Sequence, residues 1–341
     1  MKTGIFASLA LCTAMFGGVA SAEAIRISYQ PSLYWALPYY VATEKEWWAE
    51  VGLEPEFVTF PAGAPQVAAA QAKDWDVGAT GSVPAILGAS RFGLKAIGIS
   101  NDESRTNALM APKGDIEAVK ADPSQIKSIV ITTNSTADYT ARACLQKWGV
   151  DPKGVEFVNL AQAQIITAVI SGSARFAGVW APNTYTLQER ADYDYLCSGA
   201  DADAIVPGSL VVRADYAAEN PEAVQKYLAV YLKAIRWIKA NPDEAQQMLT
   251  DFYSEGGVEI SEAGAKAEFE LRPTFTLEEQ VALMARDAGA SKVDGWMTQI
   301  AEFMTSVGTI PQAPDAASYI DPAYMQGLAE NAELVAFVNA D

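Results

Sequence analysis

The sequence predicts an α/β protein of two lobes, each built on a mostly parallel sheet flanked by helices and joined to the other by two chain crossings. Strand and helix patterns alternate along the first two thirds of the chain, which is typical of parallel sheets covered on both faces. The order of elements then recurs: Gly78 and Gly178 are 100 positions apart, and Pro84 and Pro182 are 98 apart. A length of 341 residues also favours two cores over one.

The first lobe opens with a predicted strand at 25–30 and a predicted helix at 37–51. A strand at 54–60, a helix at 65–72 and a third strand at 75–80 follow. The strands are short apolar runs and the helices carry apolar side chains at helical spacing. The third strand opens into a Thr-Gly-Ser loop, so small polar residues are expected at the edge of the sheet.

The second lobe repeats this order. A strand is expected at 127–133, a helix at 137–148 and a second strand at 155–160. A helix at 163–171 and a strand at 176–180 complete the unit. The interval between the two units is too long for a solenoid repeat, so we interpret them as two similar lobes in series.

Two extended stretches, 106–112 and 208–215, lie between the lobes and are interpreted as paired crossover strands. Two crossings between two lobes predict a hinge with a cleft beside it. From about residue 215 the pattern becomes helical, with strong helices at 221–240 and 292–307. Their aromatic residues are expected to pack in the core, and these helices are expected to return and cover the first lobe.

The N-terminus has the three parts of a secretory signal peptide: one lysine, an apolar run and small residues before a cleavage site placed after Ala22. No later segment approaches the roughly 20 apolar residues that a membrane span needs, so a soluble periplasmic protein is expected. The predicted divisions are a leader at 1–22, lobe 1 at 23–110 and 213–341, and lobe 2 at 111–212.

The composition disfavours several classes of function. The formal net charge is −18, and loss of Lys2 with the leader makes it −19, which argues against nucleic acid and anionic membranes as partners. The absence of histidine removes Ser-His-Asp triads, Cys-His dyads and His-ligated zinc, so neither an enzyme nor a metal or cofactor site is predicted. The sequence leaves open whether Cys144 and Cys197 form a disulfide, because it does not show the distance and orientation of the two side chains.

The candidate site lies where ligands bind in open α/β sheets, beyond the carboxyl ends of the strands. Ser82 is a candidate N-cap in lobe 1, and Ser135 or Thr136 is one in lobe 2, with the amides of 137–139 free to meet an anion. The alternative is that these residues only cap their own helices, as every helix start requires. Two such loops facing each other across one hinge favour a binding site over capping alone. The predicted polar site residues are Gln30, Thr80, Gly81, Ser82, Asn134, Ser135 and Thr136.

Aromatic residues flank these loops and could form walls that stack on a flat or cationic ligand. Tyr34 and Trp35 follow the first strand, and Trp180 ends its counterpart in the second lobe. The alternative for all three is packing between the lobes. Tyr139 and Gly208 complete the predicted site. Further candidate polar contacts, or local caps and solvent-facing groups, are Asp138, Asn107 and Glu103.

Several segments together carry a family resemblance: EKEWWAEVGLEPEF, FPAGAPQVAAAQAKDWDVGATGSVPAIL, GVWAPNT and RPTFTLEEQ. In this order they resemble the periplasmic substrate-binding components of the taurine, alkanesulfonate and nitrate class of ABC importers, from about residue 25 to 310. The resemblance implies a type II periplasmic binding fold that closes on its ligand. It also implies a monomer that delivers the ligand to a membrane permease with a cytoplasmic ATPase.

The resemblance further implies how the site works: the Thr80-Gly81-Ser82 and Ser135-Thr136 loops would hold a sulfonate, with Trp180 against the ligand. The chain departs from the family pattern at Glu46, where a glycine is usual, a surface change of little expected consequence. Taurine binders resembling this chain place acids near Tyr34 and Gly208 to pair with the amine. Neither position is acidic here, which argues against taurine itself and favours a ligand without the amine or a flatter, stacked one.

The predicted function is therefore capture of a small organic anion, a sulfonate or taurine-like compound, by closure of two lobes. The alternative in the same class is a receptor for an aromatic acid or a nitrogen heterocycle. An alternative from another class is an enzyme like the pyrimidine-precursor synthases that share this fold. The missing histidine, the lack of a cysteine cluster and the secretory signal count against the enzyme.

Overall fold

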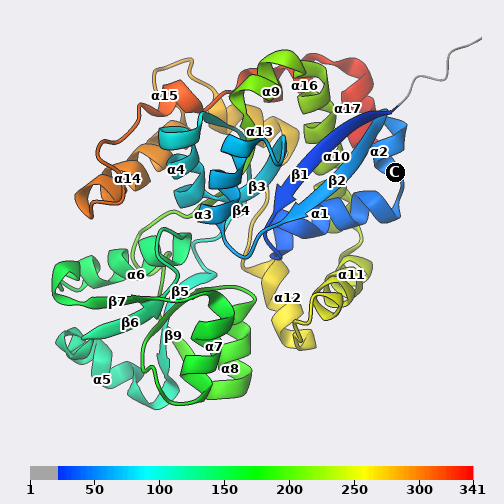
Figure 1. Ribbon diagram of the computed structural model, residues 1–341. Coiled ribbons are helices and arrows are strands. Elements are labelled where there is room, and N and C mark those ends of the chain that lie inside the picture. The colour runs from blue at the N-terminus through cyan, green and yellow to red at the C-terminus, as the bar shows by residue number, and fades with distance from the viewer. Residues whose placement is uncertain (1–21, 341) are drawn as a thin grey trace, which may run out of the picture.

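The computed structural model describes residues 22–340, which form two lobes (Figure 1). Each lobe is built around a five-stranded sheet with helices on both faces. The predicted two-lobe α/β architecture is confirmed. All but the last residue of the predicted leader lies outside the described residues.

The sheet of lobe 1 has the strand order β2-β1-β3-β10-β4. β1 pairs in parallel with β2 and β3, whereas β10 runs antiparallel to both of its neighbours. The sheet is mixed because β10 enters it from the second crossing. The strands are β1 (Glu23–Tyr29), β2 (Leu53–Thr59), β3 (Val77–Gly81), β4 (Leu94–Asp102) and β10 (Pro207–Arg213).

The sheet of lobe 2 has the equivalent order β7-β6-β8-β5-β9. β6 pairs in parallel with β7 and β8, and β5 runs antiparallel to β8 and β9. The strand that comes from the other lobe thus holds the fourth place in each sheet. The strands are β5 (Asn107–Pro112), β6 (Ser128–Ile131), β7 (Glu156–Asn159), β8 (Ala177–Trp180) and β9 (Tyr193–Ser198).

The glycine pair that revealed the repeat occupies equivalent places in the two sheets. Gly78 pairs with Ser28 between β3 and β1, and Gly178 pairs with Ile131 between β8 and β6. A Cβ on Gly78 would lie 2.2 Å from Ser28 Oγ, and one on Gly178 would lie 2.2 Å from Ile131 Cδ1. Both strands therefore need a glycine because a neighbouring side chain fills the space above them.

The two crossing strands do not pair with each other, contrary to the prediction. β5 lies in the sheet of lobe 2 and β10 in the sheet of lobe 1, because each finds two antiparallel neighbours there. The crossings are instead the segments 103–106 and 199–206. A hydrogen bond of 2.8 Å from Glu103 N to Val206 O joins them. By sheet membership, lobe 2 therefore begins with β5 and not at residue 111, and it ends before β10 and not at residue 212. Each boundary lies a few residues earlier than predicted.

Helices cover both sheets, and those after β10 gather mainly on lobe 1 (Figure 1). In lobe 1 the early helices are α1 (Leu33–Glu44), α2 (Trp47–Glu50), α3 (Gly63–Ala69) and α4 (Ser82–Phe92). In lobe 2 they are α5 (Ile116–Ala121), α6 (Thr136–Lys147), α7 (Gln162–Ile170) and α8 (Asn183–Ala191).

The remaining helices form the C-terminal part of the chain, and α10 has the bounds that the sequence predicts. They are α9 (Ala214–Glu219), α10 (Pro221–Ala240), α11 (Pro242–Glu255), α12 (Glu262–Glu270), α13 (Leu277–Met284), α14 (Lys292–Ser306), α15 (Ala316–Tyr319), α16 (Ala323–Glu330) and α17 (Ala332–Asn339). Within residues 22–340, four 3-10 helices lie at Ala70–Ala72, Lys113–Asp115, Pro123–Gln125 and Pro152–Gly154.

The helix predicted at 37–51 begins earlier and is broken. It starts at Leu33, so Tyr34 and Trp35 lie in its first turn, and it is interrupted at Glu46, whose φ is 59°. Glycine is favoured in a left-handed backbone conformation, so the glutamate at position 46 has a structural consequence that the sequence did not indicate.

β4 and β9 were not predicted, because polar residues interrupt their apolar pattern.

Each lobe has its own core. In lobe 1 one continuous cluster joins the sheet to α1 and to the C-terminal helices. In lobe 2 the two sheet faces carry separate clusters: Ile129 and Ile131 point into one, and Val130 into the other. The alternation along β6 follows from the pleat of a strand covered on both sides.

Candidate ligand-binding site

Four helices begin where the two sheets face each other, and they form two pairs across the boundary between the lobes. α4 begins opposite α6: a Cβ built on Gly81 would lie 2.6 Å from Cγ2 of Thr136. α1 begins opposite α8, where Ser32 Oγ donates to Ala181 O at 3.2 Å. The two loops predicted to face each other therefore do so, because equivalent strands in the two sheets end at this boundary.

The cap of α6 is one of the two residues that the sequence predicts, Ser135 and not Thr136. Ser135 is the N-cap: its Oγ accepts a hydrogen bond from Asp138 N at 3.2 Å and donates to Thr132 O at 2.7 Å. Asn134 has a φ of 60°, and its N–H donates to Asp138 Oδ2 at 3.0 Å. Two of the three amides predicted to be free are thus bonded, since Tyr139 N also donates to Ser135 O. Asp138 has the local capping role that was its alternative.

The cap of α4 differs from the prediction. Gly81 is the N-cap, and Ser82 is the first residue of the helix. The Ser82 side chain is fully buried, and its Oγ has no hydrogen-bond partner within residues 22–340. A buried hydroxyl without a partner loses its hydration, so this position favours a group that arrives from outside the protein.

Gln30 and Thr80 join the ends of β1 and β3 below this point. Gln30 Nε2 donates to Thr80 Oγ1 at 2.9 Å and also to Gln66 Oε1. Gln66 in turn donates to Ser28 Oγ and to Ala79 O. The side chains of Gln30 and Thr80 are both buried, and these bonds fix the strand ends on which the Gly81 turn is built.

Trp35 and Gly208 lie together although they are far apart in the sequence. A Cβ on Gly208 would lie 3.0 Å from Trp35 Nε1 and 2.1 Å from Ser100 Oγ. Gly208 therefore provides the space that the indole occupies. Trp35 is 2% exposed, and its Nε1 has no hydrogen-bond partner in the described part of the chain. An indole N–H is a donor only, so it favours an acceptor such as an anion oxygen.

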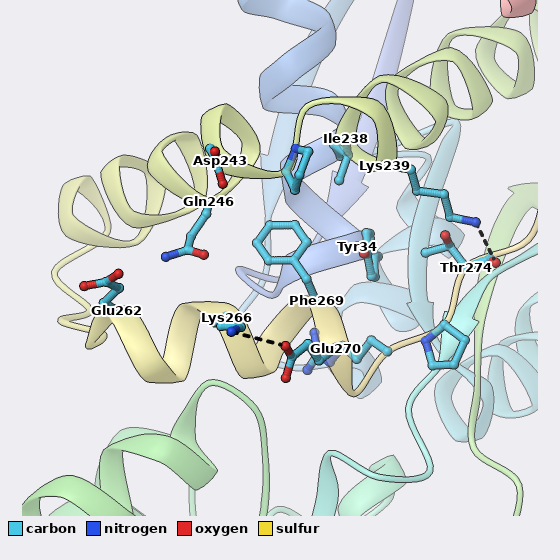
Figure 2. A pocket seen from close by; sticks show the side chains of 13 residues that line it. Tyr34, Ile238, Lys239, Asp243, Gln246, Glu262, Lys266, Phe269, Glu270 and Thr274 are labelled. Carbon is cyan, nitrogen blue, oxygen red and sulfur yellow. Dashed lines mark hydrogen bonds and ion pairs between the residues drawn. The ribbon is translucent and has the colours of Figure 1, made fainter.

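Two predicted aromatic site residues take part in packing. Tyr34 meets Phe269 edge to face with ring centroids 6.3 Å apart, and both lie on the wall of a groove of about 600 Å³ beside α12 (Figure 2). Tyr139 meets Phe303 of α14 edge to face at 4.9 Å, which joins lobe 2 to a helix of lobe 1. Tyr34 therefore packs on α12, which the prediction assigned to lobe 1, so this contact is not the packing between the lobes that was its alternative.

Trp180 ends β8 at the boundary between the lobes. It is 6% exposed, and its backbone is paired with Asn107 of β5. Asn107 Nδ2 is directed at the Glu103 backbone oxygen at 3.4 Å, whereas Asn107 Oδ1 is buried without a partner in the part of the chain described. The carbonyl oxygen of Ala181, the residue after Trp180, accepts a hydrogen bond from Ser32, the N-cap of α1 in the other lobe.

Arg272 is the residue at this boundary that the sequence reasoning missed. It is 1% exposed and donates three hydrogen bonds: Nε to Thr106 Oγ1, Nη1 to Ser32 Oγ and Nη2 to Ala181 O, each at 3.0 Å. Ser32 belongs to lobe 1, Thr106 to a crossing and Ala181 to lobe 2. The only sequence signal was that Arg272 begins the RPTFTLEEQ segment, and the nearest predicted site residue, Gly208, lies 64 positions before it.

Two buried carboxylates accompany this guanidinium. Glu268 Oε2 lies 3.1 Å from Arg272 Nη1, and Glu103 Oε1 lies 4.0 Å from it. Burial raises the pKa of Glu268 to about 7, with Arg272 opposing this effect and Glu103 adding to it. Burial likewise raises the pKa of Glu103. Glu103 is therefore a buried partner of Arg272 and not a solvent-facing residue.

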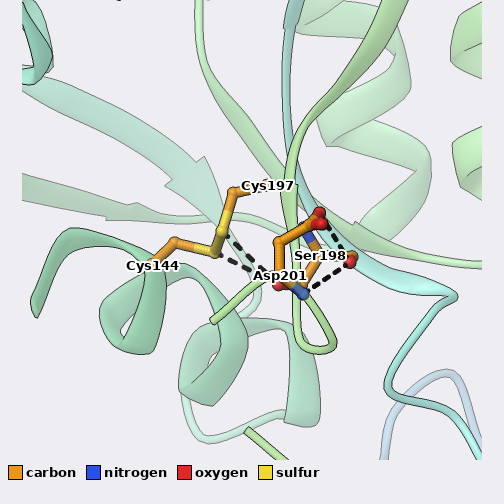
Figure 3. Close-up of a disulfide and its surroundings, with 4 residues drawn as sticks. All are labelled: Cys144, Cys197, Ser198 and Asp201. Atoms are coloured by element: carbon orange, nitrogen blue, oxygen red, sulfur yellow. Dashed lines mark hydrogen bonds between the residues drawn. A yellow bond between two sulfur atoms is a disulfide. The ribbon is translucent and has the colours of Figure 1, made fainter. Parts of the chain in front are cut away.

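Cys144 of α6 and Cys197 of β9 form a disulfide within lobe 2 (Figure 3), which resolves the alternative that the sequence left open. Their Cα atoms are 6.1 Å apart. Beside it, Asp201 Oδ2 accepts hydrogen bonds from Ser198 N and Oγ at 2.8 Å each. The bond ties the helix that begins with Thr136 to the sheet behind it.

Among residues 22–340, no group of three or more cysteine or acidic residues is arranged to hold a metal ion. No helix in the same range is long and apolar enough to cross a membrane.

Comparison with known proteins shows which proteins this chain is similar to. A model of the NMT1/THI5-like family matches residues 36–245. The chain is 26% identical to a protein of Brucella abortus (strain 2308) that is named only as a binding protein, over 94% of this chain and 97% of that one. It is 27% identical to the taurine-binding periplasmic protein of Escherichia coli (strain K12), over 90% of this chain and 94% of that one.

The crystal structure of the periplasmic aliphatic sulphonate binding protein of Escherichia coli superposes with a TM-score of 0.71 at 18% identity, covering 91% of this chain and 99% of that one. This likeness confirms the type II periplasmic binding fold. Each of these three proteins is named as a binding protein and none as an enzyme, in agreement with the prediction that the chain is not an enzyme.

Proposed function

The chain belongs to the NMT1/THI5-like family of binding proteins, and from this we propose that it is the periplasmic solute receptor of an ABC importer that captures a small organic anion, with a sulfonate as the first candidate. The solute-binding role is shared by its named relatives, one of which binds taurine. The proposed receptor delivers its ligand to a membrane permease driven by a cytoplasmic ATPase, acts as a monomer and requires no cofactor.

The observation that carries the proposal is the pairing of α4 with α6. The first turn of a helix leaves N–H groups without partners in the helix, and the aligned peptide dipoles give that end a partial positive charge. Two such ends that meet across a boundary form a site suited to an anion with several oxygens. The buried Ser82 Oγ without a partner supplies an additional donor at the same place.

The organic part of the ligand is proposed to meet the indoles of Trp35 and Trp180. Both rings are almost fully buried at the boundary between the lobes, and each comes from a different lobe. Apolar surface removed from water on closure contributes roughly 25 cal/mol per Å², which favours a ligand with an organic substituent over a bare inorganic anion.

Closure of the lobes completes the site. Arg272 bonds Ser32 in lobe 1 and Ala181 in lobe 2 at the same time, which requires the lobes to be together. A ligand that contacts both lobes shifts the population toward this arrangement, because only there are all of its contacts made. The permease can then distinguish loaded from empty receptor by the surface that closure creates.

One observation favours a second candidate, a nitrogen heterocycle. Asn107 Oδ1 is a buried acceptor without a partner within the described chain, and it lies in β5 opposite Trp180. A flat ring with an N–H donor could stack on an indole and meet this oxygen. The same experiment tests both candidates.

Isothermal titration calorimetry with alkanesulfonates, nitrate, aromatic acids and pyrimidines tests the proposal. We expect an alkanesulfonate to bind and Ser82→Ala to weaken it by about tenfold, since a hydrogen bond to a charged group contributes about 1.5–3 kcal/mol. Ser90→Ala, in the exposed part of the same helix, is the matched control and should leave the affinity unchanged. Binding of pyrimidines without sulfonates would favour the second candidate, and binding of neither class would reject the proposal.

A further inference from the structure

α12 contacts both lobes, although it belongs to the C-terminal part of the chain that covers lobe 1 (Figure 1). On the lobe 1 side, Phe269 meets Tyr34 of α1 edge to face, with ring centroids 6.3 Å apart. The residues after the helix stay with lobe 1 as well, because Asp102 N at the end of β4 donates to Pro273 O at 2.8 Å. These contacts anchor α12 in lobe 1.

Another face of α12 meets α8 of lobe 2. Ser261, the N-cap of α12, donates from its Oγ to Glu189 Oε1, and a Cβ built on Gly264 would lie 3.3 Å from the same oxygen. Just after α12, Arg272 Nη2 donates to the oxygen of Ala181, just before α8, at 3.0 Å. The contacts run forward along α12 and backward along α8, so the two helices are antiparallel. We call this contact the α8–α12 interface.

The residues of the α8–α12 interface recur at helical spacing on both sides. In and after α12 they are 261, 264, 268 and 272, and in and before α8 they are 181, 185 and 189. Positions three or four apart share one face of a helix. Tyr185 and Glu268, in the middle of the two series, are both buried. Burial raises the pKa of Tyr185, and the charge of Glu268 raises it further. Each helix thus directs one face at the other lobe.

Two carboxylates and one guanidinium lie at this interface. Glu268 is fully buried, and Glu103 and Arg272 are each 1% exposed. Both carboxylates form ion pairs with Arg272. When both are ionised, the three groups carry one net negative charge in a place without contact with water. That charge is unfavourable unless a proton neutralises it or the lobes separate and water returns.

The pKa of Glu268 agrees with this geometry. Burial raises it to about 7, while Arg272 lowers it, Glu103 raises it and the Tyr253 hydroxyl lowers it. Burial also raises the pKa of Glu103. Separation of the lobes would expose this face of α12 to water and return the pKa of Glu268 toward its ordinary value of 4.5. The closed arrangement therefore binds a proton more tightly than the open one.

We propose that the α8–α12 interface is a clasp that holds the two lobes together without a ligand and releases them when its buried carboxylate ionises. This goes beyond the receptor function, because it concerns the empty protein and no property of the ligand. The arrangement that binds more protons is favoured at lower pH. The advantage of the closed arrangement is therefore complete below about pH 4.5 and is lost as the pH rises to about 7.

The other titratable groups that face Glu268 differ from it in their response to pH. Burial raises the pKa of each neighbouring tyrosine, so these hydroxyls stay neutral, and the two carboxylates raise the pKa of Arg272, so the guanidinium stays charged. The chain contains no histidine. A change between about pH 4.5 and 7 is therefore assigned to the carboxylates. The groups around Glu268 are Tyr34 of α1, Glu103 of a crossing, Tyr185 of α8, Tyr195 of β9, Tyr253 of α11 and Arg272 after α12.

Pulsed electron paramagnetic resonance between two spin labels measures whether the interface is closed. The labels are attached to Glu262→Cys in α12 and Arg190→Cys in α8, two exposed positions next to Ser261 and Glu189. The disulfide of lobe 2 keeps its two cysteines from reacting with the label. A short distance between the labels reports the closed arrangement, and a long distance reports the open one.

The first comparison tests the carboxylate. In the empty protein, the ratio of closed to open populations should fall by at least about tenfold between about pH 5 and pH 8. Glu268→Gln should remove this dependence and remain closed, because an amide does not ionise. Glu270→Gln, which changes an exposed acid of the same helix, is the matched control and should keep the dependence.

The second comparison tests the contact itself. Gly264→Leu adds a side chain on the face of α12 that meets Glu189 and should lower the closed-to-open ratio at about pH 5 by at least about tenfold, because overpacking holds the helices apart. Ala263→Leu makes a similar addition at the neighbouring exposed position and should leave the ratio unchanged. Far-ultraviolet circular dichroism checks that both variants fold.

A third measurement uses the unaltered protein and does not depend on the folding of a variant. The radius of gyration of the ligand-free protein, from X-ray scattering, should increase between about pH 5 and pH 8 as the lobes separate. An increase that disappears in Glu268→Gln, together with opening of Gly264→Leu, would support the clasp. A radius and a population ratio independent of pH, an equal slope in Glu268→Gln, or a closed fraction unchanged in Gly264→Leu would overturn it.

These measurements separate the clasp from the proposed receptor function. No ligand enters them, so their failure would leave the anion receptor intact. Conversely, a protein that binds no anion in calorimetry but opens with pH as described would retain the clasp and lose the receptor function.

Discussion

Gly81 and Thr136 touch across the boundary between the lobes, at the ends of two helices that begin in different sheets. A single added carbon on Gly81 would come within 2.6 Å of Cγ2 of Thr136. Carbon atoms do not approach so closely, and a threonine side chain has little freedom to move aside. The contact therefore requires glycine at position 81, and it exists only while the lobes are together.

We expect Gly81→Ala to weaken ligand binding by at least about tenfold, because the new methyl group would hold the lobes apart by overpacking their contact. The folded state of each lobe should be little affected, since the φ of −73° at position 81 suits alanine. Affinity by calorimetry and the radius of gyration with ligand by X-ray scattering check this. Gly114→Ala, where an added Cβ would meet nothing within 4 Å, is the control. Unchanged affinity and compaction would show that closure does not need this contact.

Trp180→Ala should weaken binding of the true ligand by about ten- to a hundredfold, because a large buried ring at the boundary would be lost. Its backbone pairing with Asn107 should remain, so β8 is expected to stay in the sheet. Calorimetry gives the affinity, and far-ultraviolet circular dichroism checks the fold. An affinity like that of the unaltered protein would remove Trp180 from the site.

Removal of the disulfide by Cys144→Ser with Cys197→Ser should lower the free energy of unfolding of lobe 2 by about 4 kcal/mol. The bond closes a loop with a sequence separation of 53 residues, and the chain-entropy estimate for that length gives this magnitude. Urea unfolding with and without a reducing agent measures it. The reducing agent should destabilise the unaltered protein and have no effect on the double variant. Equal stability in all four conditions would contradict the prediction.

Glu46→Gly should raise the free energy of unfolding by about 0.5–1 kcal/mol. Glu46 has a φ of 59°, a conformation that costs a residue with a side chain about 1–2 kcal/mol, partly offset by the greater freedom of glycine when unfolded. The side chain is exposed, so its removal should cost little. Glu50→Gly in the neighbouring short helix, where the backbone is helical, should instead destabilise the protein.

The stability of the empty protein should decrease as the pH rises from about 5 to above 7. The pKa of Glu268 is raised from its ordinary value of 4.5 to about 7, so its contribution is fully present below 4.5 and is lost as the pH passes about 7. Lys73 lowers the pKa of Asp215 to about 2, and that contribution changes only in more acidic solution. Thermal unfolding across this pH range measures the effect, and Glu268→Gln should flatten the profile. An equal slope in that variant would assign the dependence to other groups.

Much of the fold could be predicted because it is written in local patterns. The alternation of strands and helices, the repeat marked by Gly78 and Gly178, and the amphipathic helix at 221–240 all depend on neighbours within one or two elements. The Ser135 cap and the small residues at the end of β3 could be found for the same reason. Capping and close approach of strands are decided within a few residues of the chain.

Other features were decided by residues far apart in the sequence. Whether β5 and β10 pair with each other or join opposite sheets depends on which neighbours accept them, and local pattern does not report this. The same holds for Glu268 and Arg272: in the sequence they are one acid and one base four positions apart, at the end of α12 and just after it. Folding places them between two lobes formed by other parts of the chain.

The sequence by itself determined the two-lobe class, the repeated unit and the facing of two small-residue loops, since these follow from periodicity and strand order. Only the tertiary structure decided what charge lies between the lobes. A buried charge is stable or costly according to partners that the fold brings to it. The ion-pair partner Glu268 is four positions from Arg272, but its hydrogen-bond acceptors Ser32, Thr106 and Ala181 are at least 91 positions away.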